Sequence, residues 1–87
     1  MRLKLPAVCK TRSGNFPVVI VSIDRTGCCV VAERAVLNEH EAIRLTFEGM
    51  EMLVGHISWA DAERAGIVFA RPLYAPVVDH LRRLHEG

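Results

Sequence analysis

A serine and an aspartate stand two residues apart at the end of a strongly apolar segment, and a glycine follows them. They are Ser22, Asp24 and Gly27 in the stretch VSIDRTGCCVV, residues 21–31. Side chains at positions i and i+2 of a β-strand leave from the same face, so the hydroxyl and the carboxylate are expected together beside a turn. Such a pair can hydrogen-bond a polar ligand. The aspartate also suits a turn, because it can accept hydrogen bonds from backbone N–H groups ahead of it. Both interpretations stay open, with near-equal weight.

Basic residues are concentrated at the N-terminus. The first 23 residues contain four basic residues and no acidic one, whereas the remainder contains seven basic and ten acidic residues. The four are Arg2, Lys4, Lys10 and Arg12. An anionic ligand would be drawn to this segment, although basic segments more often serve solubility alone. The net charge of +1 and the few aromatic residues argue against binding of DNA or RNA.

Patterns of catalytic or metal-binding residues are not found. The stretch HEAIR, residues 40–44, begins like a zinc-protease helix but has Arg44 where the second histidine would stand. The chain has no Cys-x-x-Cys pair, no histidine cluster and no glycine-rich phosphate loop. We therefore expect neither an enzyme nor a bound metal or cofactor. The odd number of cysteines, Cys9, Cys28 and Cys29, predicts free thiols.

Short antiparallel strands are expected to position the polar pair. Glycines and polar turns recur at the spacing of about 8–12 residues that is typical of such strands. The strand-like segments are 7–12, 16–23, 28–33, 42–48, 51–60 and 66–70. Segment 16–23 is apolar on both faces, which predicts that both faces are covered. In segment 51–60, alternation places Leu53, Ile57 and Trp59 on the core side. Trp59 could instead stack a nucleotide base, although an aromatic residue on an alternating strand more often belongs to the core.

The period of the apolar residues changes to that of a helix after Pro76. The apolar stripe consists of Val77, Val78, Leu81 and Leu84, and the polar face of Asp79, Arg82, Arg83 and Glu86. Residues 1–87 are thus predicted to form one all-β domain, a small six-stranded antiparallel β-barrel with a C-terminal amphipathic α-helix. No apolar run reaches the roughly 18 residues of a membrane span, and no secretory signal is found. We expect a cytoplasmic protein.

Several motifs occur in an order that resembles the PilZ domain family, over nearly all 87 residues. That family has an Asp/Asn-x-Ser-x-x-Gly motif at a strand end, and this chain has Ser22, Asp24 and Gly27 in the same frame with the two polar types exchanged. Upstream, Arg2 followed by LKLPAV is similar to the end of the family's Arg-x-x-x-Arg motif and its first strand. Downstream, GHISWADAERAGIVFARPL resembles the family's tryptophan strand, hairpin and Gly-x-x-Phe strand.

The resemblance implies a function in signalling. PilZ domains are six-stranded barrels that commonly bind cyclic di-GMP, a bacterial second messenger, and relay its level to a partner protein. By this resemblance, Arg2 and Lys4 would contact the dinucleotide from a mobile N-terminal segment, with Lys10 or Arg12 assisting. Ser22, Asp24 and Gly27 would bind a guanine and nearby groups. An arginine fork matches guanine O6 and N7 and also neutralises phosphate.

The departures from the family pattern fall on ligand-binding positions. The first arginine of the family motif would precede Met1, and losing one bidentate arginine costs about 1–3 kcal/mol, or about tenfold in affinity per 1.4 kcal/mol. Asp24 brings a negative charge toward an anionic ligand. We therefore expect a degenerate, weak cyclic di-GMP site. The alternative is a nucleotide-independent module that binds a protein partner, not yet identified, on a PilZ-like barrel.

Overall fold

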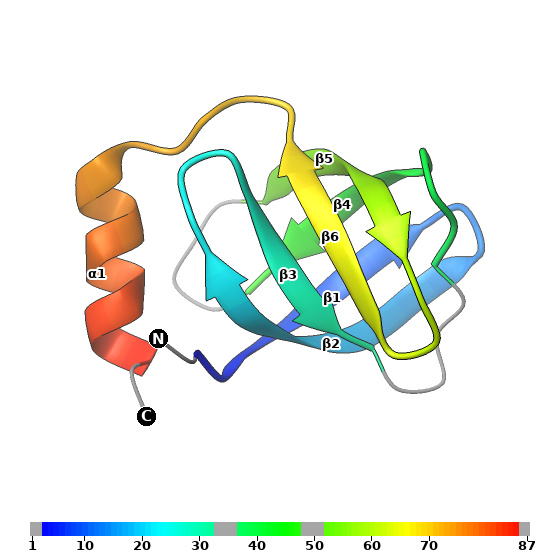
Figure 1. Cartoon of the computed structure of the whole chain (residues 1–87), viewed down its shortest axis with the longest axis horizontal. Helices are drawn as coiled ribbons and strands as arrows, with labels where there is room; N and C mark the ends of the chain where they lie inside the picture. The colour runs from blue at the N-terminus through cyan, green and yellow to red at the C-terminus, as the bar shows by residue number, and fades with distance from the viewer. Residues whose placement is uncertain (1–2, 33–36, 48–51, 86–87) are drawn as a thin grey trace.

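The computed structural model describes residues 3–32, 37–47 and 52–85 of the chain. Six strands and one helix follow in the order β1 (Leu5–Thr11), β2 (Gly14–Ile23), β3 (Gly27–Val31), β4 (Ala42–Thr46), β5 (Leu53–Ala60), β6 (Arg64–Phe69) and α1 (Ala75–His85) (Figure 1). All strand pairs are antiparallel, and the order β1-β2-β3-β6-β5-β4 closes because β4 pairs with β1. The predicted six-stranded barrel with a C-terminal helix is confirmed.

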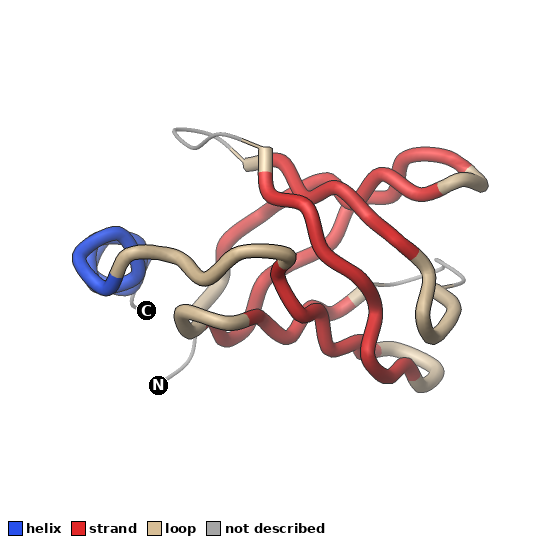
Figure 2. The backbone as a smooth tube through the Cα atoms, turned by 90° about the horizontal axis from the view of Figure 1, so that it is seen from above, coloured by secondary structure: helices blue, strands red, loops and turns tan. Residues whose placement is uncertain are grey.

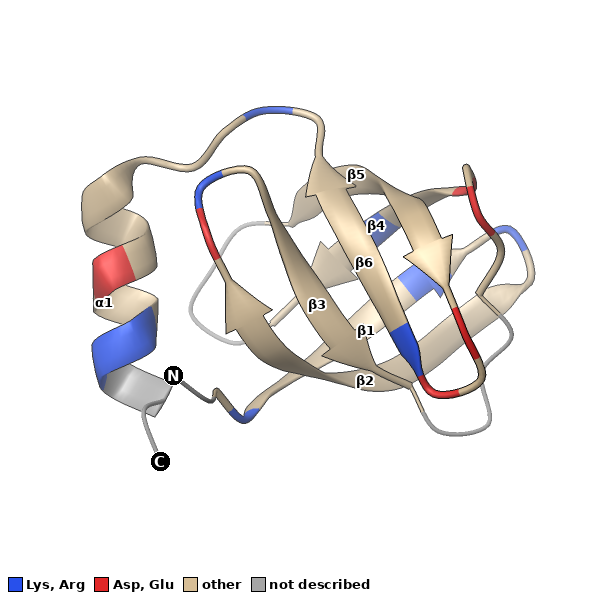
Figure 3. Cartoon of the chain, in the orientation of Figure 1, with Lys and Arg blue, Asp and Glu red and all other residues tan. Residues whose placement is uncertain are grey.

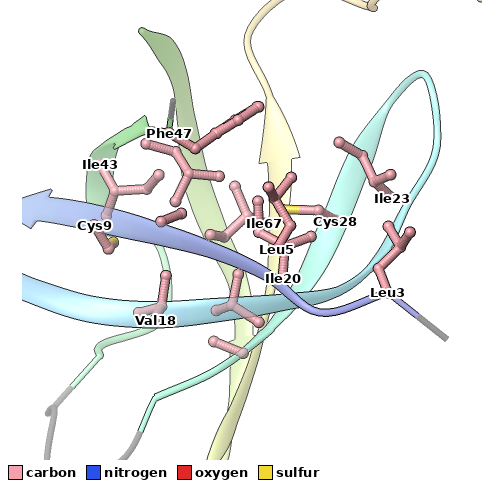
Figure 4. Packing of buried hydrophobic residues seen from close by; sticks show 14 of the residues in the cluster. Leu3, Leu5, Cys9, Val18, Ile20, Ile23, Cys28, Ile43, Phe47 and Ile67 are labelled. Atoms are coloured by element: carbon pink, nitrogen blue, oxygen red, sulfur yellow. The ribbon is translucent and has the colours of Figure 1, made fainter. Parts of the chain in front are cut away.

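The core lies inside the barrel and is built mainly by the alternation of inward and outward side chains along the strands. In β4, Ile43 and Leu45 point inward and are at most 2% exposed, as the period of two predicts. On other strands, Ile20 of β2, Val30 of β3 and Ile57 of β5 are fully buried as well. Figure 4 shows buried side chains from several strands, among them Ile20, Ile43 and Ile67, converging inside the barrel. Closure removes the free edges that an open six-stranded sheet would expose.

The outer face of β2 contradicts one prediction. Segment 16–23 was expected to be covered on both faces, yet only Val18, Ile20 and Ile23 are buried, whereas Val19 on the outer face is 37% exposed. The reason is that a barrel is one sheet closed on itself, so its strands have a single inner face to bury. The apolar outer face of β2 lies on the molecular surface in the described part of the chain.

Two β-bulges change which side chains point outward. In β2 the register shifts between Ile20 and Ser22, and in β5 it shifts between Ile57 and Trp59. Each extra residue reverses the alternation that follows it. Trp59 was predicted on the core side with Ile57, and this is wrong, because the bulge turns its indole outward and leaves it 43% exposed.

Strand boundaries differ from the predictions by a few residues. β1 begins at Leu5, which pairs with Ile20, and β6 begins at Arg64, which pairs with Val31. These positions lack a strong alternating pattern, so cross-strand pairing alone makes them strand. The predicted ends at Glu33, Glu48 and Glu51 lie outside the described residues.

The C-terminal helix packs against one end of the barrel (Figures 1 and 2). Val78 and Leu81 are each 3% exposed and belong to the core cluster, which confirms this part of the predicted apolar stripe. The side chain of Leu84 lies outside the described residues. Pro76 occupies the first turn, where its missing N–H group costs no hydrogen bond. Within the described ranges, no helix has the length and apolar character required to cross a membrane.

Two hydrogen bonds hold the segment before α1 against the turn between β2 and β3. The backbone N–H of Leu73 donates to the carbonyl of Arg25 at 2.7 Å, and Arg25 Nε donates to the Leu73 carbonyl at 3.0 Å. The helix is therefore fixed beside the turn that contains Asp24. This arrangement brings helical side chains to the polar pair.

Candidate functional site

Asp24 organises the turn between β2 and β3. Its Oδ1 accepts hydrogen bonds from the Thr26 backbone at 2.8 Å, the Thr26 hydroxyl at 2.8 Å and the Gly27 backbone at 2.9 Å. These bonds, the Thr26 hydroxyl bond foremost, keep the pKa of Asp24 below its usual value of 3.8. The turn interpretation of Asp24 is therefore correct in the structure. Its second oxygen, Oδ2, makes no hydrogen bond with the described residues and can accept one from a ligand.

Gly27 is required because two strands lie close together at this position, and not because it ends a turn. A Cβ atom at this position would collide with the carbonyl oxygen of Ile67 on the neighbouring strand. The backbone of β3 therefore approaches that of β6 closely, which only glycine allows. Gly27 therefore shapes the site by allowing β3 and β6 to lie close together.

Ser22 and Asp24 border one cavity at the helix end of the barrel. Both side chains are exposed and flank Ile23, which is 3% exposed and points inward. The cavity has a volume of about 360 Å³, and Ser22, Asp24 and Gly27 all line it. The structure thus brings three of the predicted site residues together.

Arg82 of α1 also lines this cavity, and sequence reasoning missed it. Its Nη2 donates a hydrogen bond of 2.8 Å to the carbonyl of Ile23, and its charge helps to lower the pKa of Asp24. The helical pattern placed Arg82 on the polar, solvent face. One signal could have found it, because Arg82 lies four residues after Val78 and so borders the buried stripe. Arg82 gives the cavity a fixed positive charge beside Ile23.

Trp59 provides an aromatic wall on the opposite side of the cavity. Its indole lies over Gly66, where a Cβ atom would collide with Trp59 Nε1. The bulge in β5 and the glycine in β6 together create this outward position. The cavity therefore combines an aromatic surface, a hydroxyl, a carboxylate and a guanidinium.

The N-terminal segment is bound to the barrel from Leu3 onward. The Leu3 N–H donates to the Val21 carbonyl at 3.0 Å, and the Leu3 side chain is 3% exposed (Figure 4). The resemblance implied a mobile segment here, and this is wrong for Leu3 and Lys4 because Leu3 is buried in the core. Lys4 is exposed and shares a neighbouring hollow with Ser22, while Arg2 lies outside the described residues.

Lys10 and Arg12 do not reach the cavity. They line a separate hollow of about 380 Å³ together with Arg44. The cross-strand register explains this grouping, because Lys10 on β1 pairs directly with Arg44 on β4. The suggested assistance of Lys10 and Arg12 at the nucleotide site is therefore not supported by their positions.

The three cysteines are free thiols in different environments, as predicted. Cys9 and Cys28 are buried inside the barrel, whereas Cys29 points outward and lines the cavity. Burial raises the pKa of Cys28 to about 12 and that of Cys9 to about 11. The two buried thiols therefore stay neutral and unreactive near neutral pH.

A cluster of metal-binding side chains is not found in the described part of the chain. Among residues 3–32, 37–47 and 52–85, no three His, Cys, Asp or Glu side chains converge as metal ligands.

No family model matches the chain, and no curated protein or solved structure shows a significant match to it. Only the geometry of the cavity and the sequence motifs therefore bear on the function of this chain.

Proposed function

We propose that this chain is a PilZ-like signalling adaptor that binds cyclic di-GMP weakly at the cavity beside α1. One observation carries the proposal: Ser22, Asp24, Trp59 and Arg82 line a single cavity of about 360 Å³. In this proposal the protein acts in the cytoplasm, catalyses no reaction and relays the nucleotide level to a protein partner. The sequence motifs that resemble the PilZ family suggest the ligand.

The chemistry of the cavity suits a guanine base. Stacking of a base on an exposed aromatic side chain such as Trp59 contributes about 1–3 kcal/mol. The free Oδ2 of Asp24 can accept hydrogen bonds from guanine N–H donors, and the Ser22 hydroxyl can donate or accept. Arg82 can neutralise a phosphate while it remains bonded to the Ile23 carbonyl, since a guanidinium has five N–H donors.

The volumes of the cavity and of the hollow beside it suit one half of the dinucleotide. A cavity of about 360 Å³ lies at the lower end of the range for small-molecule sites. A second hollow of about 300 Å³ shares Ser22, Ile23 and Arg82 with it. One guanine would occupy the first cavity, with ribose and phosphate extending over Arg82 into the second. Lys4 and, by the resemblance, Arg2 would approach from that side.

Weak affinity follows from the charges. Oδ1 of Asp24 is fully used in the turn, so the carboxylate cannot move away from an approaching phosphate. Arg82 offsets this repulsion only in part. A loss of about 1–3 kcal/mol from this repulsion would move a micromolar site to tens or hundreds of micromolar.

Isothermal titration calorimetry with cyclic di-GMP tests this proposal. The full chain should bind with a dissociation constant of tens to hundreds of micromolar, and Arg82→Met should weaken binding at least tenfold. Arg83→Met is the matched control, since Arg83 is exposed on the same helix and does not line the cavity. Absence of heat at a few hundred micromolar nucleotide would contradict nucleotide binding.

A second candidate function is an interaction module that needs no nucleotide. The specific observation in its favour is the apolar outer face of β2, where Val19 is 37% exposed. This reading expects that Ser22→Asp combined with Asp24→Ser, on a chain with an arginine-bearing N-terminal extension, gains nucleotide binding that the native chain lacks. Micromolar binding by the native chain would contradict it.

A further inference from the structure

A broad hollow lies on the outer surface of β1, β2 and β3, next to the candidate nucleotide cavity. We call it the β1–β3 groove. It has a volume of about 680 Å³, and its floor contains Pro6, Val19, Val21 and Val31. Lys4 and Arg64 also line it. Its surface is therefore mostly apolar, with one basic residue from the segment that precedes β1 and another from β6.

The floor of the groove is a continuous cross-strand row. Pro6 pairs with Val19, Val19 pairs with Val31, and Val31 pairs with Arg64. The row therefore crosses four neighbouring strands at right angles to their direction. At about 4.8 Å between neighbouring strands, it is about 14 Å long. An occupant of the groove would lie across the strands.

The charges of the groove have one sign. Lys4 and Arg64 are the charged residues that line it, and no acidic side chain does so in the described structure. The sequences of β1, β2 and β3 contain no aspartate or glutamate, as the absence of red on these ribbons shows (Figure 3). An acidic occupant complements this surface, whereas a basic one is repelled.

The closed sheet limits how a partner can bind. Each of the six described strands pairs with a neighbour on both sides, so none offers a whole free edge to which a partner could add a strand. Binding must then use side chains, and an amphipathic helix in an apolar groove is the recurring way to do this. At 1.5 Å per residue, a row of about 14 Å takes about nine or ten helical residues.

We infer that the β1–β3 groove binds an amphipathic helix of a partner protein, whose apolar stripe covers Val19 and Val31 and whose acidic residues meet Lys4 and Arg64. The inference rests on the adaptor part of the proposed function. It does not require nucleotide binding. Because Ser22 and Cys29 line both the groove and the nucleotide cavity, the partner would lie next to the nucleotide.

Two synthetic peptides test the inference. The first has about 18 residues, long enough to form a helix, with leucine along one stripe and glutamate on its flanks, and the second has lysine in place of each glutamate. Each is titrated into the full chain and followed by backbone amide NMR. The acidic peptide should shift the amide signals of Val19, Val21 and Val31 and should bind at least tenfold more tightly than the basic one. Equal binding of the two peptides, or no shift at these residues, would overturn the inference.

Variants separate the groove from the rest of the surface. Val19→Glu should weaken binding of the acidic peptide at least tenfold. Val54→Glu is the matched control, because Val54 is a 48% exposed valine on β5 outside the groove, and it should bind as the native chain does. The double variant Lys4→Glu with Arg64→Glu should reverse the preference and favour the basic peptide. An unchanged preference would contradict the proposed role of these two charges.

Three further measurements complete the test. If light scattering shows a dimer that Val19→Glu dissociates, the groove binds a second copy and the inference is wrong. If the chain sediments with phosphatidylglycerol vesicles and Val19→Glu abolishes this, the groove binds a lipid surface and the inference is equally wrong. Cyclic di-GMP titrated into Val19→Glu should bind with the native affinity. Loss of peptide binding in the groove can thereby be distinguished from loss of nucleotide binding in the cavity.

Discussion

The two turns 24–27 and 61–64 share the same backbone hydrogen bonds. In each, the aspartate Oδ1 accepts backbone hydrogen bonds from the residues two and three positions ahead, at 2.8 and 2.9 Å for Asp24 and at 3.0 and 2.8 Å for Asp61. In each, the aspartate N–H also donates to the fourth residue's carbonyl at 2.9 Å. The presence of an aspartate in such a turn is therefore explained by the turn alone.

The surroundings of the two turns differ. Asp24 shares a cavity with Ser22, Trp59 and Arg82, and its turn is bonded to the segment before α1. Asp61 is exposed in the turn between β5 and β6, at the end of the barrel away from α1 (Figure 1). The comparison teaches that the candidate site is defined by what the helix and the β5 bulge bring to the first turn. Four comparisons of the two turns and their neighbours test this.

The largest effect is expected at the fourth residue of each turn. Gly27→Ala places a Cβ atom against the Ile67 carbonyl and should lower the free energy of unfolding by about 3 kcal/mol, since overpacking against backbone is poorly relieved. Arg64 already carries a side chain at the corresponding position, so Arg64→Ala should change it by less than about 0.5 kcal/mol. Urea denaturation measures both. Similar losses in the two variants would refute the close approach at Gly27.

The next effect concerns the helix that only the first turn contacts. Arg82→Met removes the charged donor to the Ile23 carbonyl and should cost about 2 kcal/mol, the size of a hydrogen bond involving a charged group. Arg83→Met, on the exposed side of α1, should stay within about 0.5 kcal/mol of the native chain. Thermal and urea unfolding of the two variants check this, and equal stability would show that Arg82 does not fasten the helix.

The free energy of unfolding is expected to depend on pH because of Cys28, the residue that follows the first turn. The corresponding residue after the second turn is Ala65, which is buried and does not titrate. Because burial raises the pKa of Cys28 from 9.0 to about 12, the unfolded chain loses this proton first, and stability present below pH 9 is lost as the pH rises toward 12. The loss is about 1.4 kcal/mol per pH unit for each buried thiol, with Cys9 contributing likewise up to about pH 11.

Urea denaturation between pH 8 and about pH 10.5 measures this slope. Cys28→Ala should be less stable at every pH because it leaves a small cavity. Its stability should nevertheless fall about half as steeply above pH 9, since only Cys9 then contributes. An unchanged slope would show that the Cys28 thiol ionises as easily in the barrel as in the unfolded chain.

The smallest effect is expected for the two aspartates themselves. Hydrogen bonds within the turns lower the pKa of both Asp24 and Asp61 below 3.8. The stability that these bonds give is present above that pH and is lost as the pH falls through the lowered pKa values. NMR titration of the two carboxyl groups should show both values depressed. An ordinary value for Asp24 alone would mean that its turn is not formed as described.

The fold could be predicted from the sequence because its main signals are local. The alternation in residues 42–46 and the stripe formed by Val77, Val78 and Leu81 need no knowledge of distant contacts. The same-face placement of Ser22 and Asp24 followed from the strand period in the same way. Which strands close the barrel depends on pairing between segments far apart, such as β3 with β6.

The candidate site could be predicted only in part. The bulge at Ser58 reverses the face of Trp59, and no residue type nearby announces it. Arg82 reaches the cavity because a long side chain at the edge of a helical stripe can extend toward the barrel, which depends on how α1 docks. The bulge in β2 is also the reason why Val19 and Ser22 both point outward although they are three residues apart.

The indole N–H signal of Trp59 tests the central claim most directly, because it is the single tryptophan of the chain and lines the cavity. During NMR titration of the full chain with cyclic di-GMP, this signal should shift and saturate with a dissociation constant of tens to hundreds of micromolar, together with the amide signals of Thr26 and Gly27. The shift should be lost in Arg82→Met. An indole signal that stays in place up to a few hundred micromolar nucleotide would contradict the nucleotide site.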